Sequence, residues 1–169
     1  MQRLIDQTLK ALQTRLAENK NMIQVQVEGG DVFNATCTFH PPATENEILD
    51  FERQTGYRLP ADYKNFLKIS NGCRLFDHVT YGGEIQLYSL QELIDYNQVY
   101  DAFEGCFTIA SVYQDHIVIN SKHVLQNKQY YLYWKGSIES FEDARPLSIN
   151  FETWLDRIIV CQGTKFWLW

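Results

Sequence analysis

Histidine and cysteine are the side chains most suited to metal binding or nucleophilic catalysis, and this chain has four of each. The cysteines contain no C-x-x-C pair, and the histidines follow no metal-ligand spacing with one another or with the cysteines. They are Cys37, Cys73, Cys106, Cys161, His40, His78, His116 and His123. We therefore expect no metal site, and we expect the cysteines to be reduced and buried.

Motifs of the common catalytic and cofactor-binding sites are also missing. The sequence has no G-x-S-x-G, no P-loop and no G-x-G-x-x-G. Asp115 and His116 are adjacent at the start of a predicted strand, where neighbouring side chains point to opposite faces, so they form a poor acid–base pair. We expect no cofactor and no enzymatic activity. An enzyme acting on a small molecule is the third-ranked interpretation.

Glu52 is an acidic residue in a position that needs a partner. At 100° per residue, Ile48, Leu49 and Phe51 define the buried arc of a helix, and Glu52 lies near its middle. One interpretation is a structural hydrogen bond to the following turn or to an Arg. The other is a carboxylate with a raised pKa in a cleft. No second acid or His shares that face beyond the exposed first turn, which favours the structural role.

Glu52 belongs to the first of two short helices that the sequence predicts within residues 41–76. Thr44 and Glu47 form a capping box at its start, and Gly56 is suited to end it in the left-handed conformation. A second helix follows Leu59-Pro60, because proline holds the preceding residue extended and suits a first helical turn. Its apolar face and its end are marked by Tyr63, Phe66, Leu67 and Asn71-Gly72.

This pair of helices resembles the signature of the SUKH superfamily, which includes fungal Smi/Knr-type regulators of cell-wall synthesis and many bacterial immunity proteins. The matching positions are Ile48, Phe51, Glu52, Gly56, Leu59, Pro60, Tyr63, Phe66, Asn71 and Gly72. Weaker similarity continues at 88–90, 107–120 and 147–155. The resemblance implies a protein that inhibits a toxin domain stoichiometrically, often a nuclease delivered by neighbouring cells of the same kind.

The whole pattern predicts one α+β domain over residues 1–169, with a mainly antiparallel sheet flanked by helices. Residues 1–40 are expected to form an N-terminal helix and a β-hairpin, and residues 41–160 the SUKH-like core. Further strands are expected at 84–88, 107–112, 116–120 and 129–134, and further helices from Ser89 to about Asn97 and from Asn150 to Gly163. The strand at 129–134 has aromatic residues on both faces, which predicts a central position.

Other features bound the location of the protein. No run of some 18 apolar residues and no signal peptide is present, so we expect no membrane span and a cytoplasmic protein. The aromatic C-terminal segment 166–169 is interpreted either as a tail folded back on the core or as an exposed adhesive patch.

Charge is distributed unevenly along the chain, whose net charge is −6. The window 75–121 has no Lys or Arg, but it contains seven acids: Asp77, Glu84, Glu92, Asp95, Asp101, Glu104 and Asp115. Tyrosines are interleaved with them. The window forms either a solvated surface or a negative patch that steers a basic partner. For the second case we predict partner contacts at Asp77, Tyr81, Glu84, Asp101, Glu104 and Asp115.

We therefore predict a non-enzymatic immunity protein of a polymorphic toxin system, acting as a monomer or weak homodimer. Its partner would be a cognate toxin domain with a basic, nuclease-like surface. We expect no membrane partner, and no nucleic-acid partner because affinity for phosphates needs cationic residues that an acidic protein lacks. The alternative is a regulatory scaffold or peptide-binding module of the Smi/Knr type with no link to a toxin.

Overall fold

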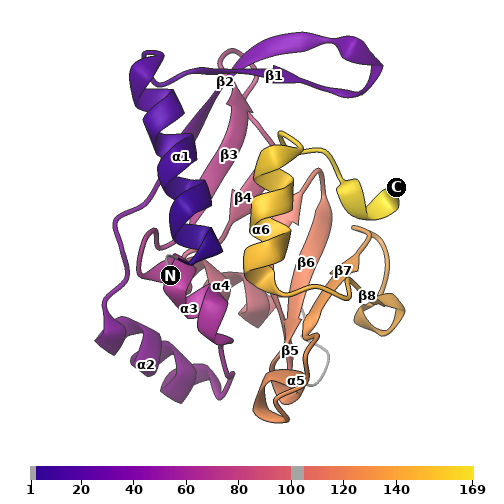
Figure 1. The fold of residues 1–169 in the computed structure, drawn as a ribbon. Coiled ribbons are helices and arrows are strands. Elements are labelled where there is room, and N and C mark those ends of the chain that lie inside the picture. The colour runs from indigo at the N-terminus through magenta and orange to yellow at the C-terminus, as the bar shows by residue number, and fades with distance from the viewer. Residues whose placement is uncertain (1–2, 100–104) are drawn as a thin grey trace.

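The computed structural model describes residues 3–99 and 105–169 (Figure 1). Within those residues, eight strands form one sheet in sequence order, and each neighbouring pair is antiparallel. The strands are β1 (Ile23–Gln26), β2 (Val32–Phe39), β3 (Cys73–His78), β4 (Ile85–Leu87), β5 (Cys106–Val112), β6 (Asp115–Asn120), β7 (Leu132–Lys135) and β8 (Arg145–Pro146). The predicted α+β class with a mainly antiparallel sheet is confirmed.

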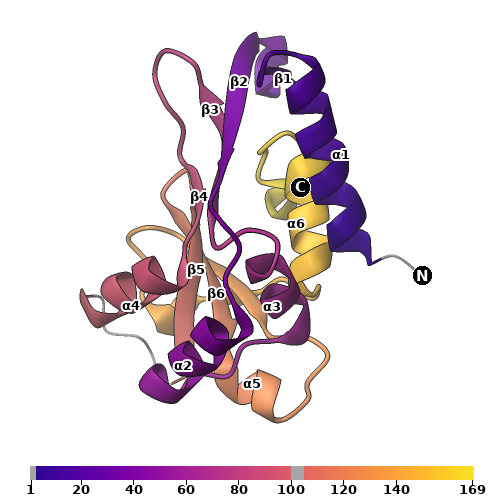
Figure 2. The ribbon, with the colours of Figure 1, turned by 90° about the vertical axis from the view of Figure 1, so that its left-hand side faces the viewer.

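Helices cover the two faces of this sheet unequally (Figure 2). They are α1 (Leu4–Glu18), α2 (Glu45–Thr55), α3 (Ala61–Leu67), α4 (Leu90–Val99), α5 (Ser121–Leu125) and α6 (Phe151–Val160), with 3₁₀ turns at Glu28–Gly30, Phe141–Asp143 and Phe166–Leu168. Helices α1, α3 and α6 lie together on one face, which we call the helix-covered face. Helix α4 packs on the opposite face, which we call the α4 face, and covers only one end of it.

Much of the hydrophobic core lies between the helix-covered face of the sheet and helices α1, α3 and α6. Helix α1 buries residues spaced by three and four positions, as its sequence pattern predicts, and α6 buries Trp154 completely. Rings from α3 and α6 meet edge to face, since the Tyr63 and Phe151 centroids are 4.8 Å apart at 81°. The N-terminal helix is therefore part of the same core as the SUKH-like region.

Local capping signals place the first helices as expected. The Thr44 hydroxyl accepts a hydrogen bond from the Glu47 N–H (3.2 Å), and the Glu47 carboxylate accepts one from the Thr44 N–H (2.6 Å). Gly56 ends α2 with φ of +73°, a left-handed conformation that glycine adopts without a steric cost. Pro60 stands one position before α3, as its N-cap.

The prediction of a central aromatic strand at 129–134 is wrong. Strand β7 begins at Leu132 and is next to the edge, paired with the two-residue β8. Tyr130 and Tyr131 precede it, and the Tyr131 hydroxyl donates to Asp62 at 2.5 Å. The aromatic side chains of this segment are therefore divided between contacts with a helix and a strand near the edge of the sheet. Aromatic residues suit both environments, so their presence does not predict a central strand.

Strand β3 and the short helix α5 were not expected. In β3 the alternation of buried and exposed residues is interrupted at Phe76, which has φ of +57°, beside a register shift in the pairing with β2. Helix α5 has only five residues, and the Asn120 side chain caps it by accepting from the His123 N–H. Short or irregular elements leave too few residues for a periodic signal.

Candidate partner-binding surface

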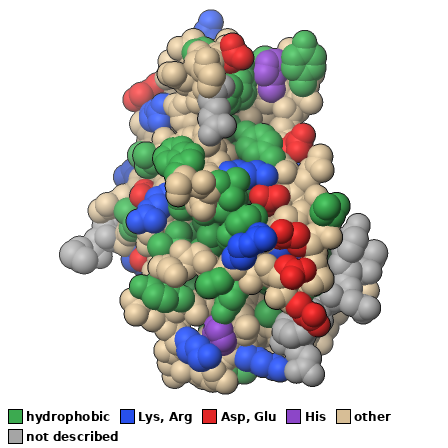
Figure 3. All heavy atoms as spheres, turned by 90° about the vertical axis from the view of Figure 1, so that its right-hand side faces the viewer, with side chains coloured by type: hydrophobic (Ala, Val, Ile, Leu, Met, Phe, Trp, Pro, Cys, Tyr) green, Lys and Arg blue, Asp and Glu red, His purple; other side chains and the backbone are tan. Residues whose placement is uncertain are grey.

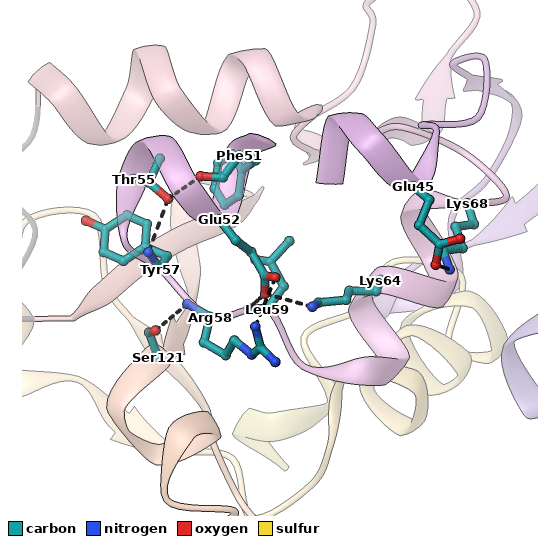
Figure 4. Close-up of polar contacts among 10 residues, drawn as sticks. All are labelled: Glu45, Phe51, Glu52, Thr55, Tyr57, Arg58, Leu59, Lys64, Lys68 and Ser121. Atoms are coloured by element: carbon teal, nitrogen blue, oxygen red, sulfur yellow. Dashed lines mark hydrogen bonds and ion pairs between the residues drawn. The ribbon is translucent and has the colours of Figure 1, made fainter. Parts of the chain in front are cut away.

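Glu52 has structural partners that account for its burial (Figure 4). Its side chain is 8% exposed, and Oε1 accepts a hydrogen bond from the Leu59 N–H at 2.8 Å. The Lys64 ammonium lies 2.8 Å from Oε1, and the Arg58 guanidinium donates to Oε2 at 3.3 Å. The carboxylate thus joins the end of α2 to the start of α3. This arrangement supports the structural interpretation.

The other signature positions hold the junction between α3, β3 and α4. Asn71 Oδ1 accepts from the Leu90 N–H (2.9 Å) at the start of α4. Gly72 has φ of +89°, and a Cβ built on it would lie 2.6 Å from the Ser89 nitrogen. Tyr63, Phe66 and Leu59 are buried. These residues therefore build the fold rather than a surface.

The acids chosen as partner contacts are not all available to a partner. Asp77 is paired with Arg74, with Oδ2 2.8 Å from Nε, and Asp115 is paired with Lys165 at 2.9 Å. Both carboxylates are mostly buried, at 16% and 15% exposure. A cation already bound to each carboxylate offsets its charge.

These two ion pairs also lie on opposite faces of the sheet. Asp115 is opposite the buried Val112, which faces the helix-covered side. Arg74, which binds Asp77, is opposite Gln86, whose amide donates to a carboxylate of α4. Asp77 and Asp115 therefore do not belong to one negative patch as predicted, since successive residues of a strand alternate between faces. Asp101 and Glu104 lie outside the described residues.

Tyr81 and Glu84 are exposed in the connection between β3 and β4. The Tyr81 side chain is 85% exposed, and its ring lies 4.7 Å from the His78 ring. The Glu84 carbonyl accepts from the Tyr113 N–H at 3.0 Å, which places Glu84 beside the turn between β5 and β6. Among residues 3–99 and 105–169, Glu84 forms no salt bridge. Its charge remains open to a partner.

A hollow of about 420 Å³ lies at this end of the molecule, between the β5–β6 turn and the C-terminal tail. Its lining residues are Val27, Tyr113, Thr164, Lys165, Leu168 and Trp169. Tyr113, Leu168 and Trp169 are 40%, 55% and 78% exposed. We call this hollow, together with the adjacent Glu84, the Tyr113–Trp169 surface.

The end of α6 positions the tail that forms this surface. Gly163 has φ of +93°, and its N–H donates to the Ile158 carbonyl, which turns the chain back toward the sheet. Lys165 then anchors the tail, since its ammonium bonds the Tyr113 carbonyl (3.2 Å) as well as the Asp115 carboxylate. The tail therefore stays beside the β5–β6 turn.

Only half of the aromatic tail returns to the core. The Trp167 ring packs near Trp154 (6.3 Å), and Phe166 lies under the Arg157 guanidinium (5.8 Å). Leu168 and Trp169 remain exposed. The first interpretation therefore holds for Phe166 and Trp167, and the exposure that the second interpretation requires is found at Leu168 and Trp169. The position of the tail depends on the contact of Lys165 with the turn at Tyr113, 52 residues away in the sequence. No local sequence signal predicts such a contact.

The side of the molecule that carries the C-terminus combines apolar side chains with charged side chains of both signs (Figure 3). Hydrophobic side chains gather across the middle of this face, and acidic side chains are more numerous along one side of them.

Burial, followed by the charge of Glu84, raises the pKa of Tyr113, so its phenol is neutral and can donate a hydrogen bond. Aromatic groups edged by charge are typical of protein interfaces.

Other kinds of site find little support in the described part of the chain. It contains no cluster of three or more His, Cys, Asp or Glu arranged to hold a metal ion. Asp115 and His116 point to opposite faces, toward Lys165 and Tyr96 respectively, as the alternation in a strand predicts. Cys37, Cys73, Cys106 and Cys161 are free thiols. No described helix has the length and apolar character needed to cross a bilayer.

Comparison with known proteins identifies a family and two relatives. A model described as the SMI1 / KNR4 family (SUKH-1) matches residues 42–157. The uncharacterized protein YnaB of Bacillus subtilis (strain 168) is 38% identical over 134 residues, which cover 79% of this chain and 88% of YnaB. The uncharacterized protein YobM of the same strain is 34% identical over 177 aligned residues, covering 100% of this chain and 94% of YobM.

Proposed function

Because the chain belongs to the SMI1/KNR4 family (SUKH-1), we propose that it is a non-enzymatic immunity protein. It binds a cognate bacterial toxin domain and neutralises it by covering the surface that the toxin needs for its activity. The partner is a protein with a basic surface, such as a nuclease, and inhibition is stoichiometric. A carboxylate-edged surface competes with nucleic acid for the same cationic residues.

The exposed aromatic residues of the Tyr113–Trp169 surface carry this proposal. Trp169 and Tyr113 border a hollow that a partner side chain can fill, and both residue types are frequent among energetically dominant interface residues. Glu84 lies next to them with its charge uncompensated in the described structure. The combination favours a partner that offers an apolar side chain and cations together.

Specificity is expected to reside mainly outside the family region. Val27, Lys165, Leu168 and Trp169 line the hollow and lie beyond the matched residues 42–157. Tyr113 and Glu84 come from within it. The common fold would therefore supply the platform, and the two terminal segments would supply the contacts that select this chain's partner.

The ion pairs of Asp77 and Asp115 change which acidic residues can test the proposal. Reversal of Asp77 or Asp115 breaks a pair within the protein as well as any contact with a partner, so its effect is ambiguous. Glu84→Lys is the cleaner test of the predicted acidic contacts. Asp95 is a matched control, because it is also an exposed acid of the same window but lies on α4.

Growth rescue tests the proposal. The toxin domain encoded in the neighbouring reading frame is expressed with this protein or with its variants, and colony growth is scored. We expect rescue by the natural protein, loss of rescue by Trp169→Ala combined with Glu84→Lys, and full rescue by Asp95→Lys. Failure of the natural protein to rescue growth from, and to bind, that toxin would contradict the proposal and favour a Smi/Knr-type scaffold without a toxin partner.

A further inference from the structure

A second hollow, of about 420 Å³, lies beside α4 on the α4 face of the sheet. Its floor comes from β5, β6 and β7, and its walls come from α4, from Tyr88 and from the segment after β7. The lining residues are Tyr88, Tyr96, Thr108, Ser111, Gln114, His116, Lys135, Ser137 and Phe141. The volume falls in the range of small-molecule sites.

Lys135 brings a nearly buried positive charge to this cleft. The residue is only 6% exposed. Its ammonium donates to the carbonyls of Gly136 (3.3 Å) and Glu139 (3.0 Å). It also lies 5.2 Å from the centre of the Phe141 ring. In the described residues no carboxylate forms a salt bridge with it. An ammonium has three donors, so one N–H remains for a further acceptor.

Thr108 adds a buried hydroxyl without a hydrogen-bond partner among the described residues. The residue is fully buried and lines the cleft. Its backbone groups are already bonded to the Asn97 side chain. The Thr108 N–H donates to Asn97 Oδ1 (2.9 Å), and the Thr108 carbonyl accepts from Asn97 Nδ2 (3.2 Å). An unsatisfied buried hydroxyl is costly, and a bound ligand would remove that cost.

Flat aromatic surfaces form one wall of the cleft. The Tyr88 and Tyr96 rings stack with centroids 5.0 Å apart, and the Tyr96 hydroxyl lies 3.3 Å from His116 Nδ1. Burial, and then the charge of Lys135, lowers the pKa of His116, so the imidazole is neutral at pH 7. None of the lining residues that the structure describes is an acid. The described lining therefore combines a cation, hydroxyl groups and aromatic faces, and the negative charges that act on Lys135, those of Glu139 and Asp115, lie outside that lining.

We infer that this cleft binds a small planar carboxylate, such as an aromatic acid. The carboxylate accepts from the Lys135 ammonium, the flat body packs between the stacked tyrosines and Phe141, and a second polar group bonds the Thr108 hydroxyl. The site is independent of the proposed toxin surface, because its side chains lie on the other face of the sheet.

Titration with 4-hydroxybenzoate, followed by tyrosine and histidine NMR shifts, tests this inference. We expect saturable binding that shifts His116 and Tyr96 signals, whereas benzamidine, of similar shape but opposite charge, causes no saturable shift. Lys135→Met should weaken binding by at least about tenfold, since a charged hydrogen bond is lost. Lys128→Met, an exposed lysine elsewhere, and Trp169→Ala should leave the affinity unchanged.

Thr108→Val keeps the inference testable if Lys135→Met fails to fold. Valine matches the shape of threonine and removes an unsatisfied hydroxyl, so the variant should fold at least as well as the natural protein. We expect its affinity for 4-hydroxybenzoate to fall several-fold. Absence of saturable binding to the natural protein, equal binding of benzamidine, or unchanged affinity in Thr108→Val would each overturn the inference.

Discussion

Two carboxylates in this protein, the nearly buried Glu52 and the partly buried Asp62, accept hydrogen bonds from backbone N–H groups at or just before the start of another helix. Glu52 binds the Leu59 N–H just before α3, and Asp62 accepts from the Glu152 N–H (3.1 Å) in the first turn of α6. The Tyr131 hydroxyl donates to Asp62 as well, while it accepts from the Phe151 N–H. An acidic group at a helix start also interacts favourably with the helix dipole. These residues consequently fix where helices meet.

Replacing Glu52 should therefore lower stability. Glu52→Ala leaves the Leu59 N–H and the Lys64 ammonium without their shared acceptor, and we expect the free energy of unfolding to fall by about 1–3 kcal/mol. Asp50→Ala, which removes an exposed carboxylate from the same helix, should change it by less than about 0.5 kcal/mol. Urea unfolding of both variants measures the difference, and equal effects would contradict the structural role.

His116 should make stability depend on pH. Its pKa is lower in the folded protein than the ordinary value of 6.5, because burial and then Lys135 disfavour the charged ring. The unfolded chain therefore binds a proton more readily, and stability is lost as the pH falls below about 6.5 toward the folded pKa. Thermal unfolding of His116→Asn between pH 7.5 and 5 should show a smaller loss than the natural protein. An identical pH profile would count against this assignment.

At the scale of elements, the turn between α3 and β3 is a closely packed junction. Asn71 caps α4 from this turn, and the backbone of Gly72 approaches the segment that links β4 to α4. The Ser70 hydroxyl donates to the Gly72 carbonyl (2.6 Å), which secures the turn from within. One short turn therefore joins both faces of the sheet, because α3 lies on the helix-covered face and α4 on the opposite one.

A side chain at position 72 should disrupt that junction. Alanine would be strained at φ of +89°, and its Cβ would lie 2.6 Å from the Ser89 nitrogen and 2.9 Å from the Leu87 carbonyl oxygen. We expect Gly72→Ala to destabilise by more than about 2 kcal/mol. Gly56→Ala has a similar φ but open space around it, so about 1–2 kcal/mol is expected. Chemical denaturation compares the two, and a smaller effect at Gly72 would refute the close-packing argument.

The whole molecule separates its two functional candidates between the two faces of one sheet. The tail after α6 forms part of the Tyr113–Trp169 surface. The cleft that we propose for a carboxylate lies on the α4 face, where strands β5, β6 and β7 form its floor beside α4. The protein carries a net charge of −6, which favours approach of a cationic partner from solution.

Salt should weaken the proposed complex mainly by slowing association. Raising the salt from about 50 to 500 mM screens charges beyond a few ångströms, so the association rate with the cognate toxin should fall at least about tenfold. Trp169→Ala should instead speed dissociation and leave that salt dependence unchanged. Surface plasmon resonance at several salt concentrations separates the two rates. A rate of association that does not respond to salt would contradict the electrostatic part of the proposal.

The capping residues and the periodic apolar positions determine most of the fold from the sequence alone. Thr44, Gly56 and Asn150 set helix ends through bonds to residues within a few positions, so local sequence contains the whole signal. The position of β7 next to the edge strand β8 and the irregularity of β3 could not be predicted, because they depend on partners distant in the chain. Aromatic and apolar residues fit several such environments.

The candidate site depends still more on long-range contacts. Composition predicted partner contacts among the acids and tyrosines of the window 75–121, and of these residues Glu84 and Tyr113 border the surface that we propose. Only the tertiary structure decided that Arg74 and Lys165 neutralise two of those acids and that Trp169 stands beside Tyr113. Neighbouring residues in the sequence determine short-range hydrogen bonds such as helix caps. The pairing of charges and of rings depends instead on how strands and the C-terminal tail, which are distant in the sequence, pack together.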